Sequence, residues 1–375
     1  QDQVELELMR SGEQKVARAY VLYREERKQI RNKEQPKEAK EKEDVKIVLE
    51  NGDEDTLDMK RLEEMVKEAC EGLEETNPQQ ILEEAKKNLY DGVSEEDART
   101  SLVMTSRTLV EQEPNYTYVT ARILLDNIRT EALTYLGMQK QATQKEMESL
   151  YPEALRNFLA KGVENEILNP ELLEMDVDKL GQAIISSRDN DFTYLGLQTL
   201  YDRYFIHHDE VRYELPQVFF MRVSMGLALR ENEREERAIE FYNLLSSFDY
   251  MSSTPTLFNS GTKHSQLSSC YLTTVPDDLH GIYGAIQDNA MLSKWAGGLG
   301  NDWTPVRGLG SQIKGTNGKS QGVVPFLKVV NDTAVAVNQG GKRKGAVCSY
   351  LETWHVDIEE FVELRKNTGD DRRRT

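Results

Sequence analysis

A cysteine followed by an acidic pair is the feature of this sequence best suited to chemistry. Cys270 lies in the strand-like run LSSCYLTTV, and Asp277 and Asp278 follow where a helical pattern begins. A strand cysteine is most often a small buried apolar residue, whereas an accessible thiolate supports redox exchange. Asp277 fits two roles, as the N-cap of the next helix or as the acceptor for a ligand hydroxyl.

Two hydroxyl side chains lie near this cysteine in the sequence. Thr254 and Ser269 both offer donors for a ligand. Because Ser269 adjoins Cys270, a regular strand places the two side chains on opposite faces unless it bulges.

Two glycine-rich loops carry basic residues, at 307–319 and at 340–345. GTNGKS resembles the end of a P-loop, but Ile313 stands where the first glycine is required. AGGLGN also departs from the dinucleotide-binding pattern. Clustered Arg and Lys on an acidic chain suit phosphate, and ordinary solvated turns explain the loops equally well.

Composition excludes several classes of protein. The net charge of -18 over 375 residues argues against a nucleic-acid-binding surface. The apolar runs are too short to span a bilayer. Three scattered cysteines do not make a disulfide framework, which indicates a reducing cytosol. Because the chain begins with Gln and ends on DDRRRT, we expect a fragment of a longer protein.

The elements that must position these residues change in character along the chain. VKIVLENGDEDTLD predicts a β-hairpin that turns at Asn51-Gly52. Helices are expected at 59–73, 78–90, 94–112 and 116–133. The last of these resembles ARAYVLYREERKQIR near the start, which indicates a degenerate repeat. Residues 145–250 are predicted to be almost wholly helical.

From residue 265 strands and helices alternate. Strand-like segments occur in LSSCYLTTV, LGNDWTPV and AVCSYLETW, separated by helical patterns such as 278–296, with Leu279, Ile282, Ile286 and Ala290 on one face. Such alternation predicts parallel strands with crossover helices, in an open α/β sheet or an α/β barrel. Three strands do not close a barrel.

Several motifs in this order resemble the large (α) subunit of class I ribonucleotide reductase. They are STPTLFNSGT…QLSSCYL, AGGLGNDWTPVRGLGS, NQGGKRKGAV and TWHVDIEEFVELRKNTGDDRRRT. The resemblance implies an α+β and α/β chain with the following parts: 1–33, the remnant of an upstream ATP-cone; 34–44, a linker; 45–136, an ATP-cone; 140–250, a helical domain; and 251–375, the first part of a ten-stranded α/β barrel, incomplete here.

The resemblance also implies roles for individual residues. Cys270 matches one of two redox-active thiols that reduce the ribose 2′ position and end as a disulfide. Thr254 and Ser269 match substrate-binding positions. The matched effector-binding positions are Asp277, Asp278, Leu279, Arg307 and Lys314, and the matched specificity-loop positions are Gln339 and Arg343. Helix 278–296 matches the helices that pair two subunits.

The activity implied is reduction of ribonucleoside diphosphates to 2′-deoxyribonucleoside diphosphates in the cytoplasm, in a homodimer controlled by ATP, dATP, dTTP and dGTP. The implied partners are a small metal-containing subunit that supplies a radical, and thioredoxin or glutaredoxin. We expect no tightly bound cofactor, no metal site, nucleic acid or membrane, and Mg²⁺ arriving with the nucleotides. The alternatives are a non-catalytic nucleotide-binding and dimerisation module or a cobalamin-dependent reductase.

The sequence lacks several catalytic residues of the family pattern. It ends before the radical cysteine, the second redox cysteine and the radical-relay tyrosines. Cys70 lies in a cone helix, and Cys348 matches no redox position and is expected to be buried. With Cys270 as its single redox thiol, the chain as given is expected to have no reductase activity.

The cone at 45–136 is predicted not to bind ATP. Nucleotide-binding cones of the family carry a basic pair before the hairpin turn, and Leu49 and Glu50 occupy those positions here. Glu50 would repel a triphosphate at close range. Calorimetry on residues 45–136 is expected to detect no ATP binding, which leaves any ATP switch to the upstream copy; micromolar affinity would contradict this.

Overall fold

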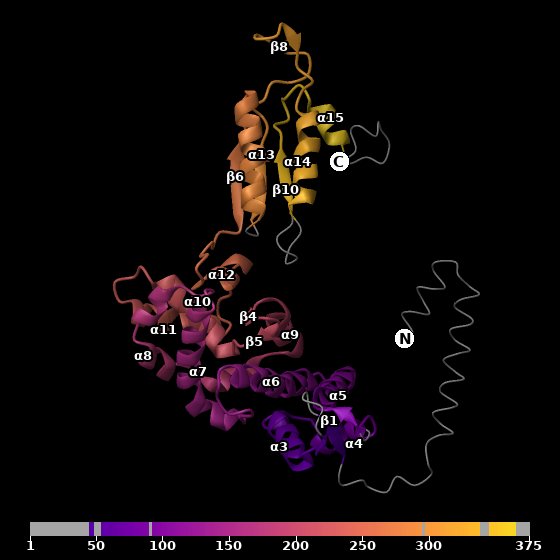
Figure 1. Cartoon of the computed structure of the whole chain (residues 1–375). Helices are drawn as coiled ribbons and strands as arrows, with labels where there is room; N and C mark the ends of the chain where they lie inside the picture. Colours follow the sequence, from indigo (N-terminus) through magenta and orange to yellow (C-terminus); the bar gives the residue numbers. More distant parts are fainter. Residues whose placement is uncertain (1–44, 49–53, 90–91, 295–296, 338–344, 365–375) are drawn as a thin grey trace, which may run out of the picture. The chain divides into compact units, whose positions relative to one another are not determined.

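The computed structural model describes residues 45–48, 54–89, 92–294, 297–337 and 345–364 (Figure 1). Its contacts divide into two compact units, one of residues up to 62 with 88–98 and one of 63–87 with 99–375. The expected upstream remnant and linker lie outside the described residues, as do Leu49, Glu50, Gln339 and Arg343.

The first unit contains a small mixed sheet in the order β2-β1-β3. β1 (Lys46–Val48) pairs antiparallel with β2 (Glu54–Thr56) and parallel with β3 (Val93–Ser94). Ile47 and Val93 are buried register partners. The two strands of the predicted hairpin are therefore confirmed, although the turn at Asn51-Gly52 is outside the described residues.

The helices predicted after this hairpin are confirmed, with small shifts at their ends. They are α3 (Met59–Cys70), α4 (Pro78–Lys86), α5 (Glu95–Thr108), continued by η1 (Leu109–Glu111), and α6 (Tyr116–Tyr135). α4 begins where it does because the Asn77 side chain accepts the Gln79 amide at 3.0 Å and Pro78 stands at the first helical position.

Residues 144–259 are mainly helical, as predicted. The elements are α7 (Gln144–Glu164), η2 (Pro170–Glu174), α8 (Val177–Gln182), η3 (Ser186–Asp191), α9 (Tyr194–Arg203), α10 (Pro216–Ala228), α11 (Arg234–Ser246) and α12 (Thr254–Asn259). The prediction missed a hairpin of β4 (His207–His208) and β5 (Val211–Arg212), because strands this short leave no readable periodicity. None of the described helices is long and apolar enough to cross a bilayer.

Two buried charges organise this helical part. The fully buried Asp189 accepts hydrogen bonds from Tyr151 at 2.6 Å, Gln217 at 2.9 Å and Arg129 at 3.1 Å. Burial raises the pKa of Asp189, while these partners favour its charged form. α6, α7 and α10 are therefore joined to η3 through one carboxylate.

The second buried charge is Arg222, which pairs with Glu214 at 2.6 Å while both side chains are fully buried. Arg222 also donates to the carbonyls of Leu257 at 3.1 Å and Ser260 at 2.6 Å, at the end of α12. Glu214 in turn accepts the Ile206 amide at 2.9 Å. This one pair thus fixes both the β4–β5 hairpin and the segment that follows α11.

The predicted strand–helix alternation after residue 265 is confirmed. The described strands β6 (Cys270–Thr274), β7 (Gly298–Asp302) and β10 (Val347–Tyr350) are parallel, in the order β10-β7-β6. The other elements are α13 (Leu279–Ser293), α14 (Val324–Ala336), α15 (Ile358–Glu363) and a hairpin of β8 (Gln312–Ile313) with β9 (Gly318–Lys319). The described residues form no closed barrel, as expected.

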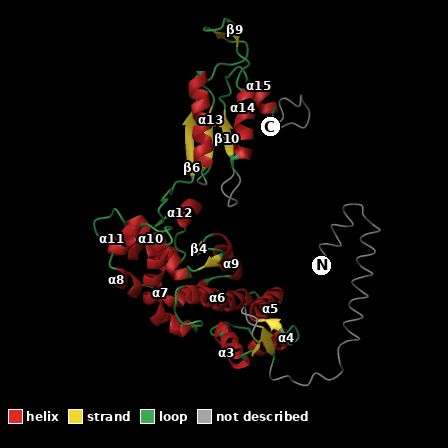
Figure 2. Cartoon of the chain, viewed as in Figure 1, coloured by secondary structure: helices red, strands yellow, loops and turns green. Residues whose placement is uncertain are grey.

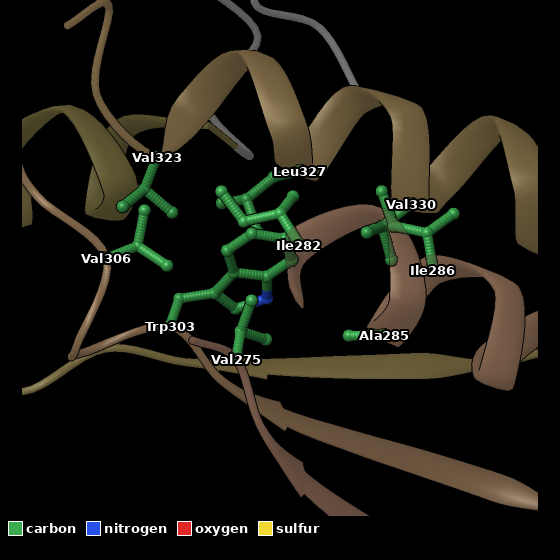
Figure 3. Close-up of a cluster of buried hydrophobic side chains, with 9 residues drawn as sticks. All are labelled: Val275, Ile282, Ala285, Ile286, Trp303, Val306, Val323, Leu327 and Val330. Carbon is green, nitrogen blue, oxygen red and sulfur yellow. The ribbon is translucent and has the colours of Figure 1, made fainter. Parts of the chain in front are cut away.

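Helices α13 and α14 cover one face of this sheet (Figures 1 and 2). An apolar cluster fills the space between the helices and the strands (Figure 3). Its largest member, Trp303, is fully buried and stacks on Phe326 with ring centroids 6.4 Å apart. The remaining cluster residues are Val275, Ile282, Ala285, Ile286, Val306, Val323, Leu327 and Val330.

Replacement of Arg222 is predicted to be strongly destabilising. Arg222→Met leaves the Glu214 carboxylate buried without its partner, which costs about 3–5 kcal/mol. Arg230→Met is the matched control, because the Arg230–Glu171 pair is on the surface, with an Arg230 side chain 81% exposed, and contributes about 0–1 kcal/mol. Denaturant unfolding should separate the two variants; equal stability losses would contradict the assigned role.

Candidate functional site

The face of the β10-β7-β6 sheet opposite the helices carries the candidate redox site. Register places Cys270, Gly300 and Cys348 on this face, since Cys270 pairs with Gly298 and Gly300 pairs with Cys348. Both cysteines are exposed free thiols. The buried interpretation of Cys348 is therefore wrong, and the small-apolar alternative for Cys270 is not supported. On the opposite face, Leu299 is buried and Val347 is partly buried against the apolar cluster under the helices.

The structure brings Ser269 and Cys270 together. Ser269 Oγ lies 3.7 Å from Cys270 Sγ. Ser269 precedes the first residue of β6, so strand alternation does not force the two side chains apart. Across from them, a Cβ at Gly298 would lie 3.4 Å from the Ser269 carbonyl oxygen and 3.8 Å from Cys270 Sγ, at ordinary van der Waals distance. A hydroxyl and an exposed thiol thus lie next to each other at the start of β6.

Thr254 is the first residue of α12 and is partly buried. Its Oγ1 lies 3.2 Å from the Tyr204 hydroxyl, and the Tyr204 ring stacks on Phe258 at 4.5 Å. The tie from Arg222 to the end of α12 also fixes this helix. The position of Thr254 is consequently set by buried contacts with the helical part of the chain.

Sequence reasoning missed Tyr350, which shares the open face with both thiols. Hydrogen bonding with the neighbouring Cys348 thiol, followed by the charges of Cys348 and Cys270, raises the pKa of Tyr350. Its position two residues after Cys348 in a strand was the signal that could have found it.

A second cluster lies beyond the C-terminal end of β6. Asp277 accepts the Arg307 backbone amide at 2.9 Å, and both of its carboxylate oxygens lie 3.0 Å from Arg307 Nε. Burial alone would raise the pKa of Asp277, but the hydrogen bonds and charge of Arg307 hold that pKa below its ordinary value. Arg307 also donates from Nη1 to the Gln312 carbonyl at 3.1 Å.

The helix cap differs from the one considered for Asp277. Asp278 caps α13, because its side chain accepts the Gly281 amide at 2.8 Å. The N-cap interpretation of Asp277 is therefore wrong, and its carboxylate pairs with Arg307 instead.

The remaining predicted effector residues are exposed. Lys314 follows β8, in the turn of the β8–β9 hairpin. Leu279 is 65% exposed, whereas Ile282 and Ile286 are buried. Leu279 is exposed because, as the first residue of α13, it lies one turn before the part of its face that packs on the sheet. Tyr283 and Met291 of α13 are also exposed.

No group of three or more His, Cys, Asp or Glu side chains among the described residues is arranged to hold a metal ion. The basic side chains of Arg307 and Lys314 suit the phosphate groups of a ligand.

Three domain families match this chain. The ATP cone domain matches residues 45–131, the all-alpha domain of ribonucleotide reductase matches 190–265, and the barrel domain of ribonucleotide reductase matches 268–375. The last match includes both Cys270 and the Asp277–Arg307 pair.

Relatives match over most or all of the chain. The ribonucleoside-diphosphate reductase subunit alpha of Chlamydia trachomatis is 51% identical over 100% of this chain and 36% of its own length. The subunit alpha of Helicobacter pylori is 37% identical over 88% of the chain and 40% of its own length. The large subunit of Danio rerio is 36% identical over 88% and 41%. The chain thus spans well under half the length of these relatives.

The three cysteines are predicted to differ in reactivity. Cys270 and Cys348 are exposed, whereas Cys70 is buried and burial raises the pKa of its thiol. Titration of the native chain with a thiol reagent should therefore give two fast equivalents and one slow one. The Cys70→Ala variant should lose only the slow phase, and a single fast thiol would contradict the open face described here.

Proposed function

This chain belongs to the large-subunit family of ribonucleotide reductases, and we propose that the protein carrying it reduces ribonucleoside diphosphates to 2′-deoxyribonucleoside diphosphates for DNA synthesis. The observation that carries the proposal is the exposed Cys270 thiol, 3.7 Å from the Ser269 hydroxyl on the open face of the barrel sheet. In the proposed organisation, residues 45–136 form the ATP-cone, 140–250 the helical domain and 251–375 the first part of the barrel.

Cys270 acts as one of two reducing thiols. Reduction of the ribose 2′ carbon replaces a C–OH bond by C–H and releases water, while two thiols become one disulfide. The small metal-containing subunit supplies the radical that activates the sugar. An external dithiol, thioredoxin or glutaredoxin, restores the thiols by exchange, which requires access to the sulfur.

Cys348 does not supply the second thiol. β7 lies between β6 and β10, which separates Cys270 from Cys348 by two strand spacings, roughly 10 Å. A disulfide requires Cα atoms within about 7 Å. Because Cys70 is buried in α3 of the cone, neither other cysteine of this chain is expected to pair with Cys270, and the chain as given is expected to be inactive.

Thr254 and Ser269 hold the substrate beside this thiol. Ser269 donates its hydroxyl to the diphosphate, and Thr254 presents its hydroxyl from the start of α12. The buried tie from Arg222 to α12 keeps the geometry of this segment rigid, so that substrate binding orders little backbone.

The Asp277–Arg307 cluster binds the nucleoside triphosphate effector. Asp277 accepts the ribose hydroxyl, Arg307 and Lys314 hold phosphates, and Asp278 and Leu279 contribute from the start of α13. Mg²⁺ arrives with the triphosphate. Gln339 and Arg343 connect the effector to substrate choice, and the exposed apolar residues of α13 form the homodimer interface. The whole protein acts in the cytoplasm.

The test replaces Cys270 in the full-length subunit assayed with its radical-generating partner. Cys270→Ser should lower CDP reduction to background with an external thiol system, because a serine hydroxyl forms no disulfide. Stability should change by less than about 0.5 kcal/mol, since the side chain is exposed. Cys348→Ser, on the same face, is the matched control and should retain activity.

Persistent turnover in Cys270→Ser would remove this residue from the reaction. Absence of CDP reduction in the wild-type protein, together with intact effector binding, would favour a non-catalytic nucleotide-binding and dimerisation module.

A further inference from the structure

Asp357, just before α15, is a buried carboxylate without a role in the function proposed above. The residue is 3% exposed. Its Oδ1 accepts the backbone amide of Leu309 at 2.7 Å, and its Oδ2 accepts the amide of Val323 at 2.8 Å. These two amides stand at opposite ends of the segment 309–323, which contains the β8–β9 hairpin. One carboxylate therefore closes this segment into a loop.

Two glycines allow the backbone to approach this carboxylate. A Cβ at Gly308 would lie 3.0 Å from Asp357 Oδ1, and one at Gly322 would overlap Oδ2. Gly322 also has a φ of +77°, which favours glycine. The position of the carboxylate thus requires glycine at 322 and leaves only a tight fit for a side chain at 308.

His355 adds a second tie at the base of the loop. Its Nδ1 accepts the Asp357 amide at 3.1 Å, so the ring is neutral with its proton on Nε2, which donates to the Val306 carbonyl at 2.8 Å. His355 is also buried. The residue immediately before Arg307 is therefore fixed by the same segment that closes the loop.

The loop itself is continuous with the Asp277–Arg307 cluster. Arg307 donates to the Gln312 carbonyl within the loop. Between the two ends, the Gly310 amide donates to the Ser320 carbonyl at 2.9 Å, and the Ser320 amide donates to the Ser311 carbonyl at 2.8 Å. A change at Asp357 would therefore be transmitted along a hydrogen-bonded hairpin to Arg307 at its base and Lys314 at its tip.

We propose that Asp357 is a positioning residue for the nucleotide-effector site, since it holds the 309–323 loop in the conformation that presents Arg307 and Lys314 to a triphosphate. This inference rests on the effector role proposed for that cluster. A buried carboxylate that accepts two backbone amides makes charge-assisted hydrogen bonds. A loop fixed in this way before binding loses less conformational entropy when the ligand arrives.

The test is Asp357→Asn in the full-length protein. The Asn side chain retains one acceptor oxygen but sets an NH2 group against a backbone N–H, so one of the two hydrogen bonds to Leu309 and Val323 is lost. The dTTP concentration for half-maximal stimulation of CDP reduction should rise about ten- to a hundredfold, with the rate at saturating dTTP unchanged. Amide hydrogen exchange at Leu309 and Val323 should accelerate. Glu359→Gln removes an exposed charge two residues away and should change neither measurement.

Each outcome distinguishes the inference from its premise. If wild-type protein binds dTTP and Asp357→Asn binds it equally tightly while the two amides exchange faster, the positioning role is overturned. If Asp357→Asn instead lowers the rate at saturating dTTP by as large a factor as it raises the half-maximal dTTP concentration, its role is merely structural, and the positioning role is again overturned. If wild-type protein does not bind dTTP, the proposed effector site itself fails, whereas the exchange data still report on the loop.

Gly308→Ala provides a second variant should Asp357→Asn fail to fold. It leaves the carboxylate intact and places a methyl group against Oδ1. A few-fold loss of dTTP affinity is expected, and wild-type affinity in this variant would overturn the inference.

Discussion

Alternation of side chains across the parallel β10-β7-β6 sheet is the constraint on which the candidate redox site depends. Residues facing α13 and α14 must be apolar or paired, and Trp303 and its cluster fill that space (Figure 3). The opposite face carries Cys270 and Cys348, paired with Gly298 and Gly300 of β7. The same pleat therefore creates both the core and the exposed thiols.

Buried charges fix the irregular segments around this sheet. Arg222 with Glu214 holds the end of α12, and Asp357 holds both ends of the β8–β9 loop. Loops have few apolar side chains with which to pack, whereas their free amides and carbonyls match a buried charge well. The cost of burying each charge is offset by several directed hydrogen bonds, and the result is a defined backbone path.

Strand β6 connects the two candidate sites. Cys270 is its first residue, and Asp277 lies just beyond its last, Thr274. A strand that is hydrogen-bonded along its length to β7 is a stiff connection. In the proposed reductase, β6 thus carries the reducing thiol of Cys270 and leads directly to the effector carboxylate of Asp277, while Gln339 and Arg343 are expected to transmit substrate choice.

The sequence by itself determined the family, the succession of hairpin, helices and parallel strands, and the residue types at the candidate sites, because periodicity and local motifs are written in neighbouring residues. It did not determine that Asp278 rather than Asp277 caps α13, that Cys348 is exposed, or that Asp357 closes a loop that begins far from it in the sequence. Each of these depends on which groups the tertiary structure brings together. Asp277 pairs with Arg307, Cys348 lies on the sheet face that no helix covers, and Asp357 accepts two amides of one distant loop. Only the assembled fold decides such pairings, because a polar side chain takes whichever partner the packed backbone presents to it.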